Sequence, residues 1–119
     1  MSKKKEVGSW GEKLVAATLE QEGFTIVARN YQKQYGEIDI IARKADLLIF
    51  VEVKLRKNPY FDSAQLITPS KQRKIIAVAK EYIAKHTDSQ MLCRFDVALI
   101  DILHNKPRIT YLANAFSEN

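Results

Sequence analysis

The run of residues from Leu48 to Leu55 constrains the fold of this chain more than any other segment. It is rich in β-branched and aromatic residues, which favour pleated, buried strands, so we expect it to be the central strand of a sheet. Four other runs have strand character, and the dipeptide Ala45-Asp46 offers a tight turn into the central one. These four predicted strands cover residues 24–31, 37–42, 94–103 and 108–113.

A first helix is predicted over residues 6–22, because apolar residues recur there at helical spacing and Gly23 follows as a stop signal. Trp10 lies within this apolar stripe and is expected in the core. The stripe consists of Val7, Trp10, Leu14 and Ala17.

A second helix is predicted from Thr68-Pro69, which fits an N-cap followed by proline at the first helical position, to about Lys85. Its apolar stripe includes Tyr82, another expected core residue. The resulting order is α-β-β-β-α-β-β, which predicts an α/β domain with a mixed β-sheet flanked by helices.

The composition agrees with one folded unit. A chain of 119 residues suffices for a single domain, 1–119, and 46% hydrophobic against 28% charged residues excludes wholesale disorder. The single Cys93 and two histidines exclude an internal disulfide and a zinc-finger ligand set. The longest apolar run, Leu47–Val51, is far shorter than the ~20 residues of a spanning helix, and no signal peptide is visible. We therefore expect a cytoplasmic protein that does not enter the membrane.

The excess positive charge is concentrated in residues 54–85, where eight basic residues face two acidic ones, a net charge of +6. The rest of the chain holds eleven basic and twelve acidic residues, a net of −1. Such a concentration suits phosphate backbones, which are bound largely through counterion release. The alternative is a solvated helix face. The predicted nucleic-acid-binding residues are Lys57, Lys71, Arg73 and Lys74.

Three charged residues in the predicted sheet carry the chemical interest: Asp39, Glu52 and Lys54. Side chains alternate along a strand, so Glu52 and Lys54 share one face of the central strand. If the preceding strand pairs with it through the Ala45-Asp46 turn, Asp39 reaches the neighbourhood of Glu52. Charged groups in so apolar a strand need a reason, because charges are rarely buried unpaired.

Two carboxylates beside a lysine suit a hard divalent cation. Mg²⁺ takes one or two protein carboxylates and fills its other positions with water and substrate phosphate. The ion lowers the pKa of bound water, and Lys54 can position that water or stabilise the transition state. The alternative is an ordinary Glu–Lys pair on a half-exposed sheet face, with Asp39 as a cross-strand neighbour.

Glu12 is a further candidate, because its flank of the first helix is largely apolar and Gly8 leaves an open patch beside it. A carboxylate aimed at the sheet from there would complete a metal site or orient its water. The alternative is a capping box with Ser9 as N-cap and Glu12 three residues later. A helix that begins near Lys5 excludes capping, and the helical stripe favours that start.

These residues belong to a series of motifs that runs along nearly the whole chain. The motifs are Gly11-Glu12, Arg29-Asn30-Tyr31, Gly36-Glu37-Ile38-Asp39-Ile40-Ile41, Phe50-Val51-Glu52-Val53-Lys54, Lys71-Gln72-Arg73 and Arg94-Phe95-Asp96-Val97. In this order they closely resemble the bacterial YraN-like family. That family is similar to PD-(D/E)XK nucleases, and most closely to archaeal Holliday-junction resolvases.

The resemblance implies a restriction-endonuclease-like core and a role for each matching residue. Asp39 and Glu52 correspond to the metal carboxylates, with Ile38 where the generic motif has proline, and Lys54 corresponds to the catalytic lysine. Glu12 matches the first-helix glutamate that resolvase-like members use near the metal. Gln72 resembles a glutamine found on the helix after the core strands, although a solvent-facing amide is an equal alternative.

The expected function is therefore a nuclease that uses Mg²⁺ or Mn²⁺ to hydrolyse phosphodiester bonds in DNA, with branched or damaged DNA as candidate substrates. A non-catalytic nucleic-acid-binding module on the same fold is the first alternative, and a protein–protein adaptor is the second. The resolvase resemblance also suggests a homodimer, because a junction presents two symmetric scissile strands, but no sequence feature fixes an interface.

Overall fold

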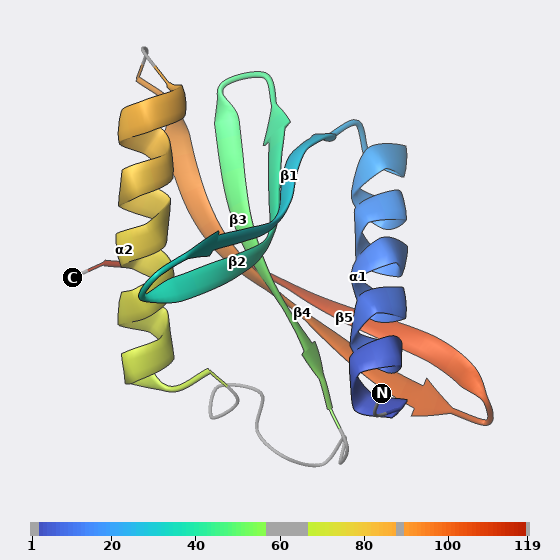
Figure 1. Ribbon diagram of the computed structural model, residues 1–119. Helices are drawn as coiled ribbons and strands as arrows, with labels where there is room; N and C mark the ends of the chain where they lie inside the picture. The colour runs from blue at the N-terminus through green and yellow to red at the C-terminus, as the bar shows by residue number, and fades with distance from the viewer. Residues whose placement is uncertain (1–2, 57–66, 88–89, 119) are drawn as a thin grey trace.

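The structure, a computed structural model, describes residues 3–56, 67–87 and 90–118. Its helices and strands follow the predicted order (Figure 1). Most strands extend beyond their predicted limits. The elements are α1 Lys3–Gln21, β1 Thr25–Lys33, β2 Gly36–Lys44, β3 Leu47–Leu55, α2 Pro69–His86, β4 Leu92–Leu103 and β5 Lys106–Phe116.

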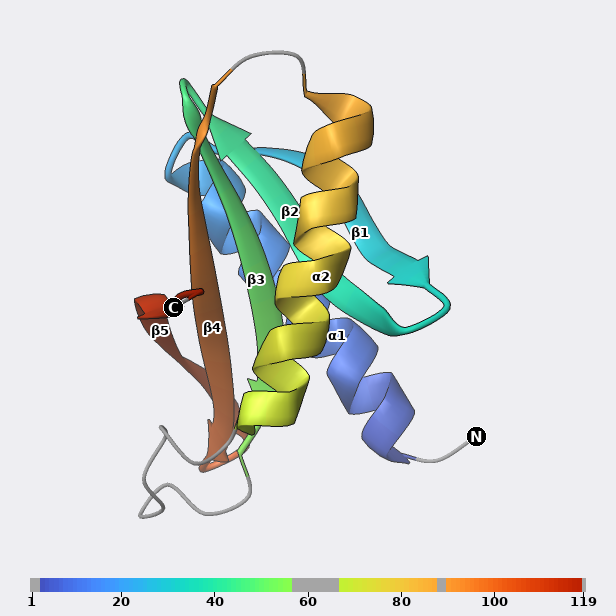
Figure 2. The same cartoon turned by 90° about the vertical axis from the view of Figure 1, so that its left-hand side faces the viewer.

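The five strands form one sheet in the order β1-β2-β3-β4-β5, with β3 at its centre as predicted. Neighbouring strands are antiparallel except β3 and β4, which run parallel and are connected through α2. The sheet is therefore mixed. Figures 1 and 2 show α2 on one face of the sheet and α1 on the other.

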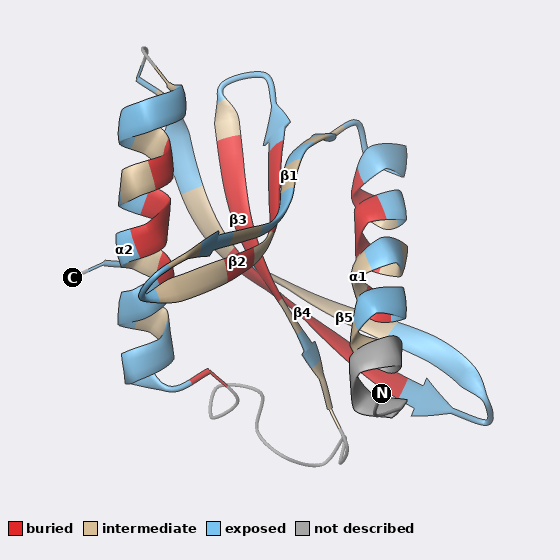
Figure 3. Ribbon diagram, viewed as in Figure 1, coloured by how far each residue is buried: buried red, intermediate tan, exposed pale blue. Residues whose placement is uncertain are grey.

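Both faces of the sheet are buried at its centre, because a helix covers each of them (Figure 3). On β3, Leu48 and Phe50 pack in the cluster beneath α2, whereas Ile49 and Val51 pack in the cluster beneath α1. A strand covered on both faces has no reason to alternate apolar and polar residues. This explains why the central strand is the most apolar segment of the chain, and it makes a charged residue on that strand unusual.

The buried face of α1 differs from the predicted one. Trp10 is 43% exposed, and the helix instead packs through Val15, Ala16 and Leu19. The reason lies at Gly11, where an added Cβ would come within 2.4 Å of the Ile100 side chain on β4. The glycine side of the helix approaches the sheet closely, and the stripe with Trp10 is turned away.

The start of α2 is as predicted. The Thr68 side chain accepts a hydrogen bond from the Lys71 N–H at 3.1 Å, and Pro69 occupies the first helical position. Proline lacks an N–H that would have no helical partner there. The Thr68 cap thereby fixes the residue at which α2 begins. Neither helix of the described chain has the length and apolar character needed to cross a bilayer.

Gly11→Val is expected to destabilise the protein by about 1–3 kcal/mol, because an inserted branched side chain must displace Ile100 in a packed core. Gly8→Ala is the matched control, since nothing lies within 4 Å of a Cβ at Gly8. That change should stabilise the helix by up to ~1 kcal/mol through helix propensity. Urea denaturation of both variants measures the difference, and equal effects would contradict the close approach of α1.

Candidate active site

The site lies where β2 and β3 separate. Their paired register runs from Lys44↔Leu47 to Ile40↔Val51. One residue further, the Asp39 Oδ2 atom accepts the Val53 N–H at 2.8 Å. A side-chain carboxylate thus takes the hydrogen bond that a backbone carbonyl would accept in a continuing ladder.

The strict alternation expected along β2 also breaks at this point. Ile41 lies beneath α2 and Ile40 beneath α1, as alternation requires, but Ile38 lies beneath α2 as well. The prediction that every second residue of β2 shares a face is therefore wrong before Asp39. The physical reason is that Asp39 turns into the β2–β3 gap and bonds the β3 backbone.

Asp39 and Glu52, called the acid pair below, lie close enough for the Asp39 carboxyl to perturb Glu52. Glu52 is buried, with 7% of its surface exposed. Burial, followed by the neighbouring Asp39 carboxyl, raises the pKa of Glu52 to about 8. The Lys71 Nζ atom, 3.2 Å from Glu52 Oε2, acts in the opposite direction but does not outweigh them. At neutral pH the acid pair therefore retains a proton, which a bound cation would displace.

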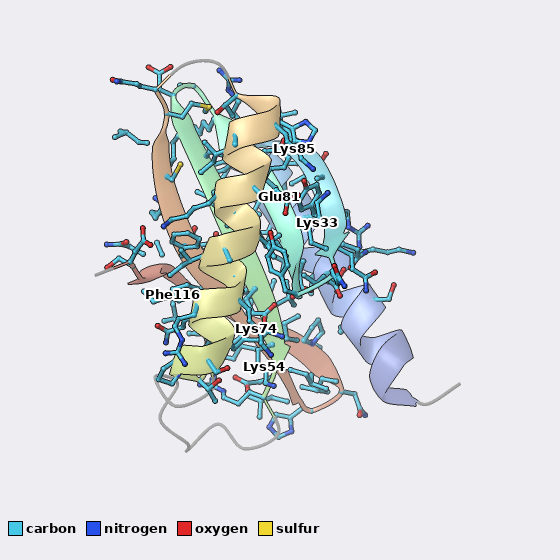
Figure 4. All side chains as sticks on the ribbon, turned by 60° about the vertical axis from the view of Figure 1, so that its left-hand side comes forward. Lys33, Lys54, Lys74, Glu81, Lys85 and Phe116 are labelled. Atoms are coloured by element: carbon cyan, nitrogen blue, oxygen red, sulfur yellow. The ribbon has the colours of Figure 1, made fainter. Side chains whose placement is uncertain are left out.

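Lys54 lies two residues beyond Glu52 on β3. Glu52 contacts Lys71 of α2, so the face of β3 that carries Phe50 and Glu52 is the α2 face, and strand alternation assigns Lys54 to it. Lys54 is exposed and forms no ion pair with any other described residue. Figure 4 shows it near the start of α2. Its ammonium group is therefore available to a ligand beside the acid pair.

Glu12 approaches the site from the α1 side of the sheet. It is the tenth residue of α1, so the prediction that it lies inside the helix is confirmed and capping is excluded. Burial, followed by the negative charge of Asp39, raises the pKa of Glu12. Asp39 is thus flanked by Glu12 and Glu52 from opposite faces of the sheet.

A hollow of about 440 Å³ lies beside Glu12, lined also by Gly8, Ser9, Asn30 and Glu37. The predicted open patch at Gly8 is confirmed by the absence of any atom within 4 Å of an added Cβ. With its nitrogen turned inward, the Asn30 amide donates to Glu12 at 2.9 Å and to Glu37 at 3.2 Å. Asn30 and Glu37 both belong to the sequence motifs, and here the Asn30 amide bridges the Glu12 and Glu37 carboxylates.

The donor set fits one hard cation at the acid pair but not a closed all-protein site. Among the described residues, no three histidine, cysteine, aspartate or glutamate side chains converge as metal ligands. Mg²⁺ needs only one or two carboxylates, since water and substrate complete its coordination. Asp39 and Glu52 meet that requirement, and Glu12 as a third ligand stays a prediction.

Gln72 is not brought to the acid pair. Its side-chain amide donates to the Ile67 carbonyl at 3.0 Å, and it lines a pocket of about 450 Å³ with Val97 and Leu112. It is half-buried rather than solvent-facing. The preceding residue, Lys71, is the one that contacts Glu52. One step along a helix turns a side chain by about 100°, which sequence resemblance alone did not resolve.

Much of the predicted basic strip is neutralised by acids from other parts of the chain. Lys71 pairs with Glu52, Arg56 with Asp101 and Lys80 with Glu118. Lys85 pairs with Glu81 within the strip. Arg73 and Lys74 form no ion pair within the described chain, and Lys57 lies outside the described residues.

The fold and the site define a class of protein: a mixed-sheet α/β protein whose strands β2 and β3 separate at a half-buried aspartate and a buried glutamate, with a lysine on the same strand as the glutamate. The chain belongs to the family described as Uncharacterised protein family UPF0102, whose model matches residues 11–100. This is the YraN-like family whose motifs the sequence resembles, and the family prediction is confirmed.

Its relatives match over nearly their whole length. A UPF0102 protein of Nitrosomonas europaea is 38% identical over 120 residues, covering 100% of both chains. A UPF0102 protein of Dictyoglomus thermophilum is 42% identical over 116 residues, covering 94% of this chain and 98% of its own. A UPF0102 protein of Geobacter metallireducens is 39% identical over 113 residues, covering 94% and 93%. The similarity therefore includes the helices and strands that build the site.

Proposed function

We propose that this protein is a metal-dependent nuclease that hydrolyses phosphodiester bonds in DNA, on a restriction-endonuclease-like core. The observation that carries the proposal is the acid pair, with one carboxylate buried beside a second at the point where β2 leaves β3. The Asp39 carboxylate opposes ionisation of the buried Glu52 beside it. A divalent cation bound to both carboxylates offsets the repulsion between their negative charges.

The residues have distinct roles in this proposal. Asp39 and Glu52 hold Mg²⁺ or Mn²⁺, which when bound lowers the pKa of water and offsets charge on the phosphate oxygens. Lys54 orients the attacking water and stabilises the developing negative charge as a point charge. Glu12 orients water from the α1 side of the sheet. Gln72 would have to leave the Ile67 carbonyl to take part, so we assign it no step.

DNA binding in the proposal rests on the start of α2. Lys71, Arg73 and Lys74 lie in its first turns, and Lys71 contacts Glu52 of the acid pair. Branched or damaged DNA is the proposed substrate class. A homodimer, with two such sites for two strands, is part of the same proposal.

A non-catalytic DNA-binding module is the second candidate, and one observation favours it. Lys71 already places a cation 3.2 Å from Glu52. If that ion pair persists with DNA bound, the acid pair has a structural role and needs no metal. Metal binding therefore separates the two candidates, since only a nuclease requires it.

The experiment is a cleavage assay with Mg²⁺ or Mn²⁺ on four labelled DNAs: duplex, single strand, flap and four-way junction. Metal-dependent cleavage of any of them supports the nuclease and identifies its preferred substrate shape. Binding of these DNAs without cleavage, and without stabilisation of the protein by Mn²⁺, supports the binding module. Failure to bind any of the four removes both candidates and favours a protein–protein adaptor.

Lys54→Ala is expected to reduce the cleavage rate by roughly 10²–10³-fold, the cost of losing one electrostatic contact to the transition state. The affinity for Mn²⁺ should change far less, because Lys54 is exposed and is not a metal ligand. Single-turnover rates at several Mn²⁺ concentrations separate the two effects. A lower melting temperature with an unchanged rate would make Lys54 a structural residue.

A further inference from the structure

A second concave surface adjoins the acid pair. It is a groove of about 310 Å³ between the β1–β2 turn and the first turns of α2. Its charged lining comprises Lys33, Lys71 and Lys74 against a single acid, Glu37. Lys33 lies far from Lys71 and Lys74 in the sequence and reaches them only because the turn packs on the helix.

The contact between turn and helix is close. A Cβ at Gly36 would lie 3.2 Å from the Val78 side chain and 3.4 Å from the Lys74 Cβ atom. The absence of a side chain at Gly36 therefore lets the turn rest against α2. This proximity gives the groove two walls, with Lys74 on the helix side and Lys33 on the strand side.

Glu81 of α2 contacts Lys33 on the strand-side wall (Figure 4). It accepts the Tyr35 hydroxyl and lies 3.7 Å from the Lys33 Nζ atom and 2.9 Å from that of Lys85. The Tyr35 hydroxyl, followed by Lys85, lowers the pKa of Glu81 to about 2. Glu81 thus stays charged at any pH at which the protein works, and the wall stays in place.

The groove is continuous with the acid pair through Lys71, which lines it and also contacts Glu52. Lys74 follows one helical turn later. We propose that this groove binds a backbone phosphate of DNA next to the phosphate held at the acid pair, with Lys33 and Lys74 as its binding residues. The proposal rests on the proposed function. Lysines that converge in a concave surface focus positive potential, which attracts phosphate.

The proposal gives the β1–β2 turn a function that α2 alone does not supply. A strand that crosses the acid pair would run along Lys71 into the groove and touch both walls. Lys33 then contributes to affinity although it lies outside the basic strip of residues 54–85. This distinguishes the groove from a general attraction of DNA to the start of α2.

The test is DNA binding by the full chain, measured by fluorescence anisotropy with a labelled single strand and a labelled duplex at several salt concentrations. Lys33→Ala and Lys74→Ala should each weaken binding roughly three- to tenfold and reduce the salt slope by about one. Lys80→Ala is the matched control, because Lys80 lies on α2 but lines a different pocket. It should change neither quantity appreciably. Melting temperatures confirm that all three variants fold.

Each outcome decides the proposal. If Lys33→Ala behaves like Lys80→Ala, or if the wild type binds neither DNA, the groove is not a phosphate site. If Lys33→Ala weakens binding while the wild type cleaves nothing, the groove stands and the nuclease fails. If the wild type cleaves DNA and neither groove variant differs from the control, the nuclease stands and the groove fails.

Discussion

Asp39→Asn is expected to abolish metal-dependent DNA cleavage while the fold and DNA binding are retained. The asparagine oxygen can still accept the Val53 N–H that Asp39 binds at 2.8 Å, so the strands keep their separation. The substitution removes one of two anionic ligands, and a metal contributes several kcal/mol to transition-state stabilisation, which corresponds to about 10³-fold or more in rate. Loss of a negative charge near bound phosphate should leave DNA affinity unchanged or slightly higher.

Asp46→Asn is the matched control, because Asp46 is an exposed aspartate at the other end of the same β2–β3 hairpin. It should cleave like the wild type. Running the three proteins from parallel preparations also excludes a contaminating nuclease. Full activity in Asp39→Asn would remove Asp39 from the site. Equal DNA binding by all three without any cleavage would favour the binding module.

The geometry of the acid pair could be predicted because it depends on local rules. A tight turn at Ala45-Asp46 and antiparallel pairing bring Asp39 opposite Glu52, and strand alternation places Lys54 on the face of Glu52. The predicted helix start likewise decided the position of Glu12. Each of these inferences needed only the period of an element and the length of a turn.

The remaining features depend on which face of a helix packs against the sheet. Sequence periodicity does not distinguish between several similar faces. Trp10 and Gly11 are neighbours on α1, and only the fit of the glycine against Ile100 shows which of them turns inward. Similarly, Lys71 rather than Gln72 reaches Glu52 because the buried apolar residues of α2 pack on the sheet and set the rotation of the helix. The break in alternation before Asp39 is a tertiary effect, and no local pattern signals it.

The sequence pattern does not predict the groove, for a related reason. The net charge along the sequence groups the basic residues at the start of α2 with others that the fold neutralises. Examples of the neutralised residues are Arg56 and Lys80. Lys33 is distant in sequence from the basic strip of residues 54–85, so the strip does not include it. Only the fold shows which lysines converge on one concave surface.

Glu52→Gln is expected to change the pH dependence of stability more than any other single substitution considered. The folded-state pKa of Glu52, about 8, lies above the ordinary glutamate value of 4.5. Between these values the native protein keeps a proton that the unfolded chain releases. The free energy of unfolding of the wild type should therefore fall as pH rises through this window.

Glutamine cannot ionise, so the variant loses this slope. Its stability relative to the wild type should be near zero at pH 5 and favourable by about 3–5 kcal/mol at pH 9, since each pKa unit corresponds to ~1.4 kcal/mol. Urea denaturation at both pH values measures the difference. Glu20→Gln, a change at an exposed glutamate of α1, controls for the loss of one carboxylate from the surface.

Metal ions should reverse the sign of this comparison. Mn²⁺ displaces the proton of the acid pair, so at pH 8 it should stabilise the wild type and leave Glu52→Gln nearly unaffected. Parallel stability of the two proteins across pH would mean that Lys71 keeps Glu52 ionised. In that case the Lys71–Glu52 ion pair, at 3.2 Å, is the stable structure of the site. The acid pair then needs no metal cation to balance its charge, and the binding module becomes the better proposal.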